Sequence, residues 1–214
     1  DINKNYWSNE ICELLDIKPE RCPPLIAPHE EVGTITPQVA KSTGLSKKTR
    51  VFAGAADNAS GAIGAGILEN GKTLCSIGTS GVILSYENNA DKDFQGQVHY
   101  FNHGAPEVYY TMGVTLSAGQ SLSWFKETFA KGQSYEELLK DVSSVPIGSN
   151  GLLFTPYLAG ERTPHADSLI RASFIGMDSS HRQKDFARAV LEGITFSLNE
   201  SIDIFRKNGK MVDT

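Results

Sequence analysis

The sequence predicts an α/β fold, and three observations lead to this prediction. An apolar run at 51–53 ends in small residues and one acid, Asp57, where a strand would give way to a helix, a placement typical of active sites in open α/β sheets. Two runs of β-forming residues, 73–77 and 82–86, flank a Gly-Thr-Ser-Gly turn. A long pattern that begins near Ser180 repeats apolar residues with helical spacing. Strands and helices therefore both contribute to the expected core.

Short elements and a connector are expected before residue 50. Ser8 is a good N-cap for a short amphipathic helix. Prolines at positions 19, 23, 24 and 28 exclude regular structure, so this stretch is expected to be a connector. Thr36 followed by Pro37 predicts the start of a second helix, which ends at Gly44.

The middle of the chain is expected to contain a helix followed by strands. Residues 58–66 are rich in Ala and Gly at helix-compatible spacing, so this helix could pack very closely on a neighbour. The runs 73–77 and 82–86 predict a hairpin around the Gly-Thr-Ser-Gly turn, with more than one register open. A further strand is expected at 108–112.

Helices are expected to dominate the second half of the chain. Apolar spacing predicts one helix at 117–129 and a shorter one at 135–142. Ser180 opens a capping-box pattern, and the apolar stripe that follows ends at Asn208 and Gly209. We assign this stripe to the core.

Composition limits the class of protein. A chain of 214 residues that is 40% hydrophobic can hold one ordinary domain or the larger part of a two-lobed one. Its net charge of −5 argues against broad binding to nucleic acid or anionic lipid. The apolar runs are shorter than the ~20 residues that span a bilayer. Three cysteines without C-x-x-C spacing and the lack of a signal-peptide pattern predict a cytoplasmic location.

Two segments carry residues suited to chemistry. Asp57 is either a base or the N-cap of the following helix, and its spacing alone does not decide between them. Gly78 and Gly81 let the backbone of the turn approach a phosphate, or they simply close a hairpin. A base and an anion cradle together suggest phosphoryl transfer to an alcohol. No histidine or cysteine spacing predicts a metal site.

Four segments carry a family resemblance. They are Ala-Gly-Ala-Ala-Asp-Asn at 53–58, Ser-Ile-Gly-Thr-Ser-Gly-Val at 76–82, Pro-Tyr-Leu-Ala-Gly-Glu-Arg-Thr-Pro-His at 156–165, and a last signature within 172–193. Together they closely resemble the FGGY carbohydrate kinases, in particular bacterial members that act on xylulose. The resemblance covers essentially the whole chain in the right order. It implies an actin-like, ribonuclease H-like ATPase fold with two lobes and an active site in the cleft between them.

The resemblance also implies roles for the acid and its neighbour. Asp57 corresponds to the catalytic base, which aligns the sugar hydroxyl and accepts its proton as the bond to phosphorus forms. Asn58 corresponds to a residue that hydrogen-bonds the sugar, and its amide can both donate and accept. The polar loop 160–165 is either solvated or near the cleft, where Arg162 would assist charge neutralisation.

Nucleotide-binding positions follow from the same resemblance. Gly78 and Thr79 match the turn that approaches the terminal phosphates of ATP, and Gly119 and Ser123 match positions that contact the nucleotide. Trp124 either packs in the core or contacts ATP. Mg²⁺ would arrive with ATP and be bound mainly through its phosphates.

The resemblance implies that this chain is part of a larger kinase. Residues 1–50 are expected to be the end of the first lobe and a connector, and residues 51–214 most of the second, nucleotide-side lobe. The family's Asp-x-Gly-Thr phosphate hairpin and its Gly-Gly-Gly adenosine loop are not found, so the isolated chain is expected to be inactive or nearly so.

The implied activity of the parent kinase is ATP-dependent phosphorylation of D-xylulose to D-xylulose 5-phosphate. Another ketose or polyol as substrate is one alternative, and a non-catalytic binding or assembly module is an alternative of another class. The expected partner is a small-molecule sugar, without nucleic acid or membrane, and a homodimer is an option.

Overall fold

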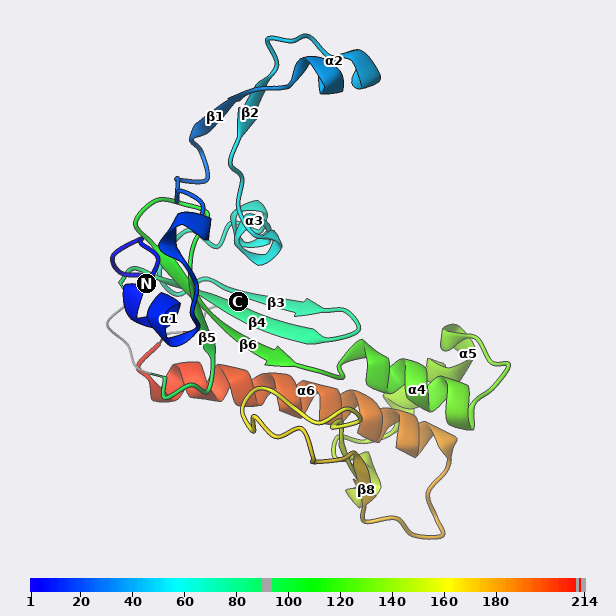
Figure 1. Cartoon of the computed structure of the whole chain (residues 1–214). Helices are drawn as coiled ribbons and strands as arrows, with labels where there is room; N and C mark the ends of the chain where they lie inside the picture. The colour runs from blue at the N-terminus through cyan, green and yellow to red at the C-terminus, as the bar shows by residue number, and fades with distance from the viewer. Residues whose placement is uncertain (90–93, 211, 213–214) are drawn as a thin grey trace. The chain divides into compact units, whose positions relative to one another are not determined.

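In the computed structural model, residues 1–89, 94–210 and 212 are described, and they divide into two units. The first unit comprises residues 1–69 with 86–89 and 101–110, and the second comprises 70–85, 94–100, 111–210 and 212. Figure 1 shows the elements of both units coloured along the chain. None of the helices in these described ranges is both long and apolar enough to cross a membrane.

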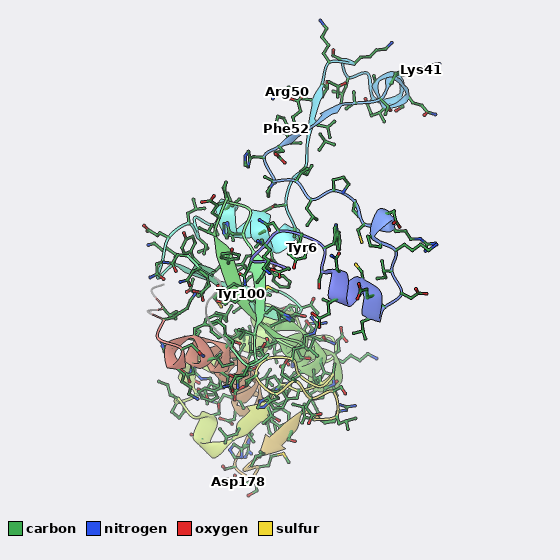
Figure 2. The ribbon with its side chains drawn as sticks, turned by 60° about the vertical axis from the view of Figure 1, so that its left-hand side comes forward. Tyr6, Lys41, Arg50, Phe52, Tyr100 and Asp178 are labelled. Atoms are coloured by element: carbon green, nitrogen blue, oxygen red, sulfur yellow. The ribbon has the colours of Figure 1, made fainter. Side chains whose placement is uncertain are left out.

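The first unit is built mainly from short elements. They are α1 (Asn9–Leu14), the 3₁₀ helix η1 (Pro19–Arg21), β1 (Glu31–Thr34), α2 (Pro37–Thr43), β2 (Arg50–Phe52) and α3 (Asp57–Gly64). Strands β1 and β2 pair antiparallel, with α2 between them in the chain. Figure 2 shows Arg50 and Phe52 on β2, where the Arg50 guanidinium lies over the Phe52 ring at 4.9 Å. The proline-rich stretch contains no element longer than η1, as expected of a connector.

Helix starts in the first unit follow the predicted caps. The Ser8 hydroxyl accepts the N–H of Ile11 at 3.3 Å, and the Thr36 hydroxyl accepts that of Val39 at 3.3 Å. Gly44 ends α2 in the left-handed conformation, with φ of 76°. Both predicted helix starts and the predicted end at Gly44 are confirmed.

The second unit contains most of the sheet and the long helices. Its remaining elements are β3 (Thr73–Ile77), β4 (Gly81–Glu87), β5 (His99–Asn102), β6 (Tyr109–Thr115), α4 (Gly119–Phe129), α5 (Tyr135–Leu139), η2 (Val142–Ser144), η3 (Ser149–Gly151), β7 (Leu153–Thr155), β8 (Ser173–Ile175) and α6 (Gln183–Lys207). Strands β4, β5 and β6 also extend into the first unit. One sheet has the order β3-β4-β6-β5, and β7 pairs antiparallel with β8.

The predicted hairpin forms, but its turn is shorter than the four residues Gly-Thr-Ser-Gly. Ile77 pairs with Gly81, so three residues, 78–80, connect the strands. Strand β6 is longer than the predicted 108–112 and runs to Thr115. This extension matters because it brings the end of β6 to the start of α4.

Helix α6 organises the core of the second unit, as its apolar stripe predicts. Val190, Ile194, Leu198 and Phe205 are buried on it, in a cluster that also contains Ile83 of β4. Figure 1 shows α4 beside α6.

The start of α6 differs from the predicted one. Asp185 Oδ2 accepts the N–H of Arg182 at 2.7 Å, which makes Arg182 the N-cap. The Ser180 hydroxyl instead donates to Asp178 Oδ1 at 2.6 Å, so the predicted capping box does not form.

Candidate functional site

Asp57 is the first residue of α3 in the first unit. The N-cap position belongs to Ala56, which has no capping side chain, so the N-cap alternative for Asp57 is not observed. Its Oδ1 accepts the N–H of Asn58 at 2.7 Å, and the Asp57 side chain is exposed. A negative charge in the first turn is favourable because the helix dipole is positive there. Asp57 is therefore held at a helix start through one carboxylate oxygen, and the residue is exposed.

The segment before Asp57 is anchored to the connector. Gly54 N donates to Pro28 O at 2.9 Å, and Ala53 N donates to Glu30 O at 3.1 Å. Gly54 has φ of 75°, a left-handed conformation that glycine adopts without strain. These contacts turn the chain from β2 towards α3.

Tyr110, a buried residue of the same unit, interacts electrostatically with the carboxylate of Asp57. Burial raises the pKa of the Tyr110 hydroxyl, and the negative charge of Asp57 raises it further. The hydroxyl thus stays protonated near neutral pH, which leaves a neutral donor near the acid.

The Gly-Thr-Ser-Gly turn of the second unit is clamped to the start of α4. Gly119 N donates to Gly78 O at 2.9 Å, and Gln120 N donates to Thr79 O at 3.1 Å. A Cβ on Gly119 would lie 2.5 Å from Gly78 O, so only glycine fits there without a shift. Because Ala118, the N-cap of α4, offers no side-chain cap, the carbonyls of the turn cap the helix instead.

The outer side of this turn is available to a ligand. In the described part of the chain, the N–H groups of Thr79 and Ser80 make no hydrogen bond. A Cβ on Gly78 would have only Ser80 O nearby, at 3.8 Å. Adjacent free N–H groups in a turn form a concavity that suits an anion. The turn therefore offers backbone donors of the kind that bind anions.

Ser123 and Trp124 lie one helical turn further along α4. The Ser123 hydroxyl donates to Gly119 O at 3.2 Å and lies 2.9 Å from the Tyr135 hydroxyl. The Trp124 ring stacks on Phe154, with centroids 6.1 Å apart. This packing agrees with the core alternative for Trp124.

The structure thus groups the sequence-predicted residues in two sets. Gly78, Thr79 and Gly119 share hydrogen bonds, with Ser123 one turn away. Asp57 and Asn58 form a pair in the first unit. Within residues 1–89, 94–210 and 212, no group of three or more His, Cys, Asp and Glu side chains is arranged to hold a metal ion.

Sequence reasoning missed Glu161. Its position in a polar loop suggests a solvated charge, but its side chain is buried, with 3% of the residue exposed. Burial raises the pKa of Glu161 despite hydrogen bonds from Arg162 N and Leu116 N. Burial, followed by the charges of Glu200 and Glu161, also raises the pKa of the neighbouring Tyr157 to about 12. Only the position of Glu161 between Gly160 and Arg162 in a family segment could have drawn attention to it.

Comparison with known families assigns the chain to a class. The C-terminal domain of the FGGY family of carbohydrate kinases matches residues 73–214, and the N-terminal domain of this family matches residues 1–64. The chain therefore belongs to the FGGY family of carbohydrate kinases. Asp57 lies in the part matched by the N-terminal domain, and the turn at 78–80 lies in the part matched by the C-terminal domain.

Individual relatives narrow this class. A xylulose kinase of Bacillus subtilis (strain 168) is 62% identical over 213 residues, which cover 100% of this chain and 43% of the relative. A xylulose kinase of Lactococcus lactis subsp. lactis (strain IL1403) is 51% identical over 97% of this chain and 41% of its own length. The chain thus spans less than half the length of these relatives.

Solved structures confirm the predicted α/β, actin-like ATPase fold. A ligand-bound xylulose kinase from Lactobacillus acidophilus matches with a TM-score of 0.91 and 29% identity, over 98% of this chain and 43% of that one. A gluconate kinase from Lactobacillus acidophilus gives the same TM-score of 0.91 with 27% identity over the same shares, 98% and 43%. The fold alone therefore does not choose the sugar.

Proposed function

We propose that the protein containing this chain transfers the terminal phosphoryl group of ATP to D-xylulose and forms D-xylulose 5-phosphate. The observation that carries this proposal is the 62% identity to a xylulose kinase across 100% of the chain. Phosphoryl transfer depends on positioning and on electrostatic stabilisation, and both the exposed carboxylate of Asp57 and the free N–H groups of the 78–80 turn suit that task. A small-molecule sugar is its partner in this proposal, and it acts in the cytoplasm without nucleic acid or membrane.

In this proposal the first unit supplies the sugar-side groups. The Asp57 carboxylate aligns the attacking hydroxyl of the sugar and accepts its proton late in the reaction. The Asn58 amide hydrogen-bonds the sugar, for which a group that both donates and accepts is well suited. In the proposed division into lobes, residues 1–50 are the end of the first lobe and a connector. Residues 51–214 form most of the second lobe, with Asp57 and Asn58 at its beginning.

The second unit supplies the nucleotide-side groups. The N–H groups of the Gly78–Thr79 turn receive the terminal phosphates, while Gly119 and Ser123 border the nucleotide. ATP provides the transferred phosphoryl group, and Mg²⁺ accompanies it through phosphate oxygens and water. Clamping of the turn to α4 by the Gly119 and Gln120 N–H groups supports this assignment, because a fixed turn needs no reorganisation when the phosphates bind.

A substrate panel tests the sugar. Full-length protein is assayed for ADP release with ATP and D-xylulose, gluconate, glycerol or another ketose. We expect the highest kcat/KM with D-xylulose. A preference for gluconate would favour the relation to the gluconate kinase structure instead.

Two experiments use the isolated 214-residue chain. It should show no appreciable turnover. Sedimentation of the chain with and without ATP tests the assembly-module alternative and a homodimer.

Substitution of Asp57 tests the proposed base. Asp57→Ala in the full-length protein should lower kcat by about a hundredfold to ten-thousandfold, the range for loss of a general base. Its Kd for ATP should change little, because the nucleotide contacts lie elsewhere. Glu13→Ala removes an exposed acid of α1 and is the matched control. Turnover of Asp57→Ala at the rate of the control would contradict the assignment.

A further inference from the structure

Glu161 links two segments that are far apart in the sequence. Its Oε1 accepts the N–H of Leu116 at 2.8 Å and the N–H of Arg162 at 2.7 Å. Leu116 follows the last residue of β6 and precedes the start of α4. A buried side chain thus holds the backbone just before the helix that clamps the phosphate turn.

Leu116 is also held from its other side by the turn. The Ser80 hydroxyl donates to Leu116 O at 3.2 Å. Ser80 belongs to the turn whose Gly78 and Thr79 carbonyls accept N–H groups from the first residues of α4. One backbone segment therefore connects Glu161 to the turn through hydrogen bonds on both of its sides.

The loop that carries Glu161 is fixed along β6. Thr163 N donates to Val114 O at 3.0 Å, and Val114 N donates to the Thr163 hydroxyl at 3.1 Å. Glu161 N donates to Asp167 O at 2.8 Å, and Asp167 N returns a bond to Glu161 O at 3.0 Å. With its backbone held in this way, the Glu161 side chain has a stable base from which to set the position of Leu116.

Only one oxygen of Glu161, Oε1, takes part in these hydrogen bonds. Its Oε2 has no hydrogen-bond partner within the described residues. Glu200 is near enough to oppose ionisation, whereas His165 favours it, and burial raises the pKa of Glu161 overall. A glutamine at this position would offer an acceptor oxygen to Leu116 N from a side chain of the same length.

We propose that Glu161 is a positioning residue that holds the Gly78–Ser80 turn in its phosphate-binding geometry by accepting the N–H of Leu116. This inference rests on the proposed function, because it assumes that the turn receives the terminal phosphates of ATP. Glu161 itself touches neither nucleotide nor sugar in this proposal. Its loss should therefore weaken the use of ATP more than the use of the sugar.

The test compares three substitutions in the full-length protein. Glu161→Ala should raise KM for ATP by about tenfold, the effect of losing one buried hydrogen bond, with a smaller change in KM for D-xylulose. Glu161→Gln keeps an acceptor oxygen and should stay within about twofold of wild type, because it preserves that bond. Glu161→Asp keeps the charge but shortens the side chain, so it should resemble Glu161→Ala.

A matched control and a coupling measurement separate positioning from general loosening of the loop. Asp167→Ala removes a carboxylate of the same loop that accepts Leu169 N at 2.7 Å, and it should leave KM for ATP near the wild-type value. Ser80→Ala breaks the second bond to Leu116. Its effect on KM for ATP should combine non-additively with that of Glu161→Ala, because both act on one backbone segment.

The outcomes distinguish a failure of the proposed function from a failure of the positioning role. A wild-type protein without sugar kinase activity would refute the proposed function. An active wild type with unchanged KM for ATP in Glu161→Ala would overturn the positioning role. Equal impairment of Glu161→Gln and Glu161→Ala, or of Asp167→Ala and Glu161→Ala, would also overturn it. If Glu161→Ala does not fold, the comparison of Glu161→Asp with Glu161→Gln gives the answer, and equal KM values for ATP would reject the inference.

Discussion

The two units use their apolar side chains differently. In the second unit, α6, α4 and β7 surround one cluster in which Phe125, Leu152 and Phe205 are almost completely buried. No described residue of the first unit belongs to this cluster, and Leu14 and Val32 of that unit are 82% and 60% exposed. The second unit also has exposed apolar residues outside the cluster, such as Ile147 at 88%. A side chain in a close-packed cluster cannot change volume without cost, whereas an exposed one can. Substitutions inside this cluster should therefore lower the free energy of unfolding more than substitutions at exposed positions of the first unit.

The largest effect is expected at Gly193, where α6 crosses β7. A Cβ at this position would collide with the carbonyl oxygen of Phe154 and lie 3.1 Å from its ring. Neither group can move freely, because Phe154 is in a strand and in the core. Gly193→Ala should therefore lower the free energy of unfolding by about 1–3 kcal/mol or more. Urea unfolding of the chain measures this, and unchanged stability would show that α6 and β7 are less tightly packed than described.

A second contrast concerns two glutamates, one in each unit. Glu192 of α6 accepts hydrogen bonds from Arg188 at 2.7 Å, the Ser149 hydroxyl at 2.9 Å and Gly148 N at 3.1 Å. Burial favours a higher pKa for Glu192, but these hydrogen bonds together outweigh it and lower the pKa. Glu31 of β1 pairs with Arg50 at 2.7 Å, where both side chains are exposed, 38% and 62%.

Neutralising these two glutamates should lower the free energy of unfolding by different amounts. Glu192→Gln should destabilise the chain by about 1–3 kcal/mol at pH 7, because bonds to a charged acceptor are lost. Glu31→Gln should cost about 0–1 kcal/mol, as is usual for an exposed ion pair. The test is urea unfolding of both variants at pH 7, and equal losses would contradict the contrast.

The pH dependence of Glu192 has a defined sign. Because its folded-state pKa is lowered, its stabilisation is present above the unfolded-state pKa of about 4.3 and is lost as the pH falls through the lower folded-state value. The difference in unfolding free energy between wild type and Glu192→Gln should therefore shrink below about pH 4. A difference that is constant from pH 7 to pH 3 would exclude this explanation.

Local patterns in the sequence predict much of this fold. The stripe on α6, the caps at Ser8 and Thr36, and the hairpin around Gly78 all follow from short-range spacing, and the structure confirms them. The predicted start of α6 is wrong, because the Asp185 side chain accepts the N–H of Arg182. The Ser-x-x-Gln pattern at Ser180 does not show that a second capping interaction competes with it. Local signals were sufficient for the caps of α1 and α2 and for the stripe of α6, but they did not decide between two competing caps at the start of α6.

Contacts between distant segments could not be predicted in the same way. Glu161 binds the N–H of Leu116, 45 residues earlier, and a bond from a side chain to a backbone N–H leaves no periodic trace in sequence. The clamp between Gly78 and Gly119 is similar, because only the structure shows why the second glycine cannot carry a Cβ. The sequence thus suggested candidate residues for the site, but not the hydrogen bonds between distant segments that hold them in place.

The smallest expected effect is at Gly61, in the middle of α3 of the first unit. The Ala- and Gly-rich sequence of this helix suggests close packing, and Ala59 and Ala62 are indeed buried. A Cβ on Gly61, however, would meet no atom within 4 Å. Since alanine favours the helix over glycine by about 1 kcal/mol, Gly61→Ala should leave the 214-residue chain unchanged or stabilise it by up to this amount.

Gly61→Ala is the matched opposite of Gly193→Ala, because both add one methyl group to a helix. Urea unfolding of the two variants, measured together in the isolated chain, should give a loss of stability for Gly193→Ala and either no change or a gain for Gly61→Ala. The same pair in the full-length protein sharpens the comparison. A loss of stability for Gly61→Ala there, but not in the isolated chain, would mean that the rest of the protein packs against this face of α3. A loss in the isolated chain itself would contradict the open surroundings of Gly61 and remove the contrast between the two units.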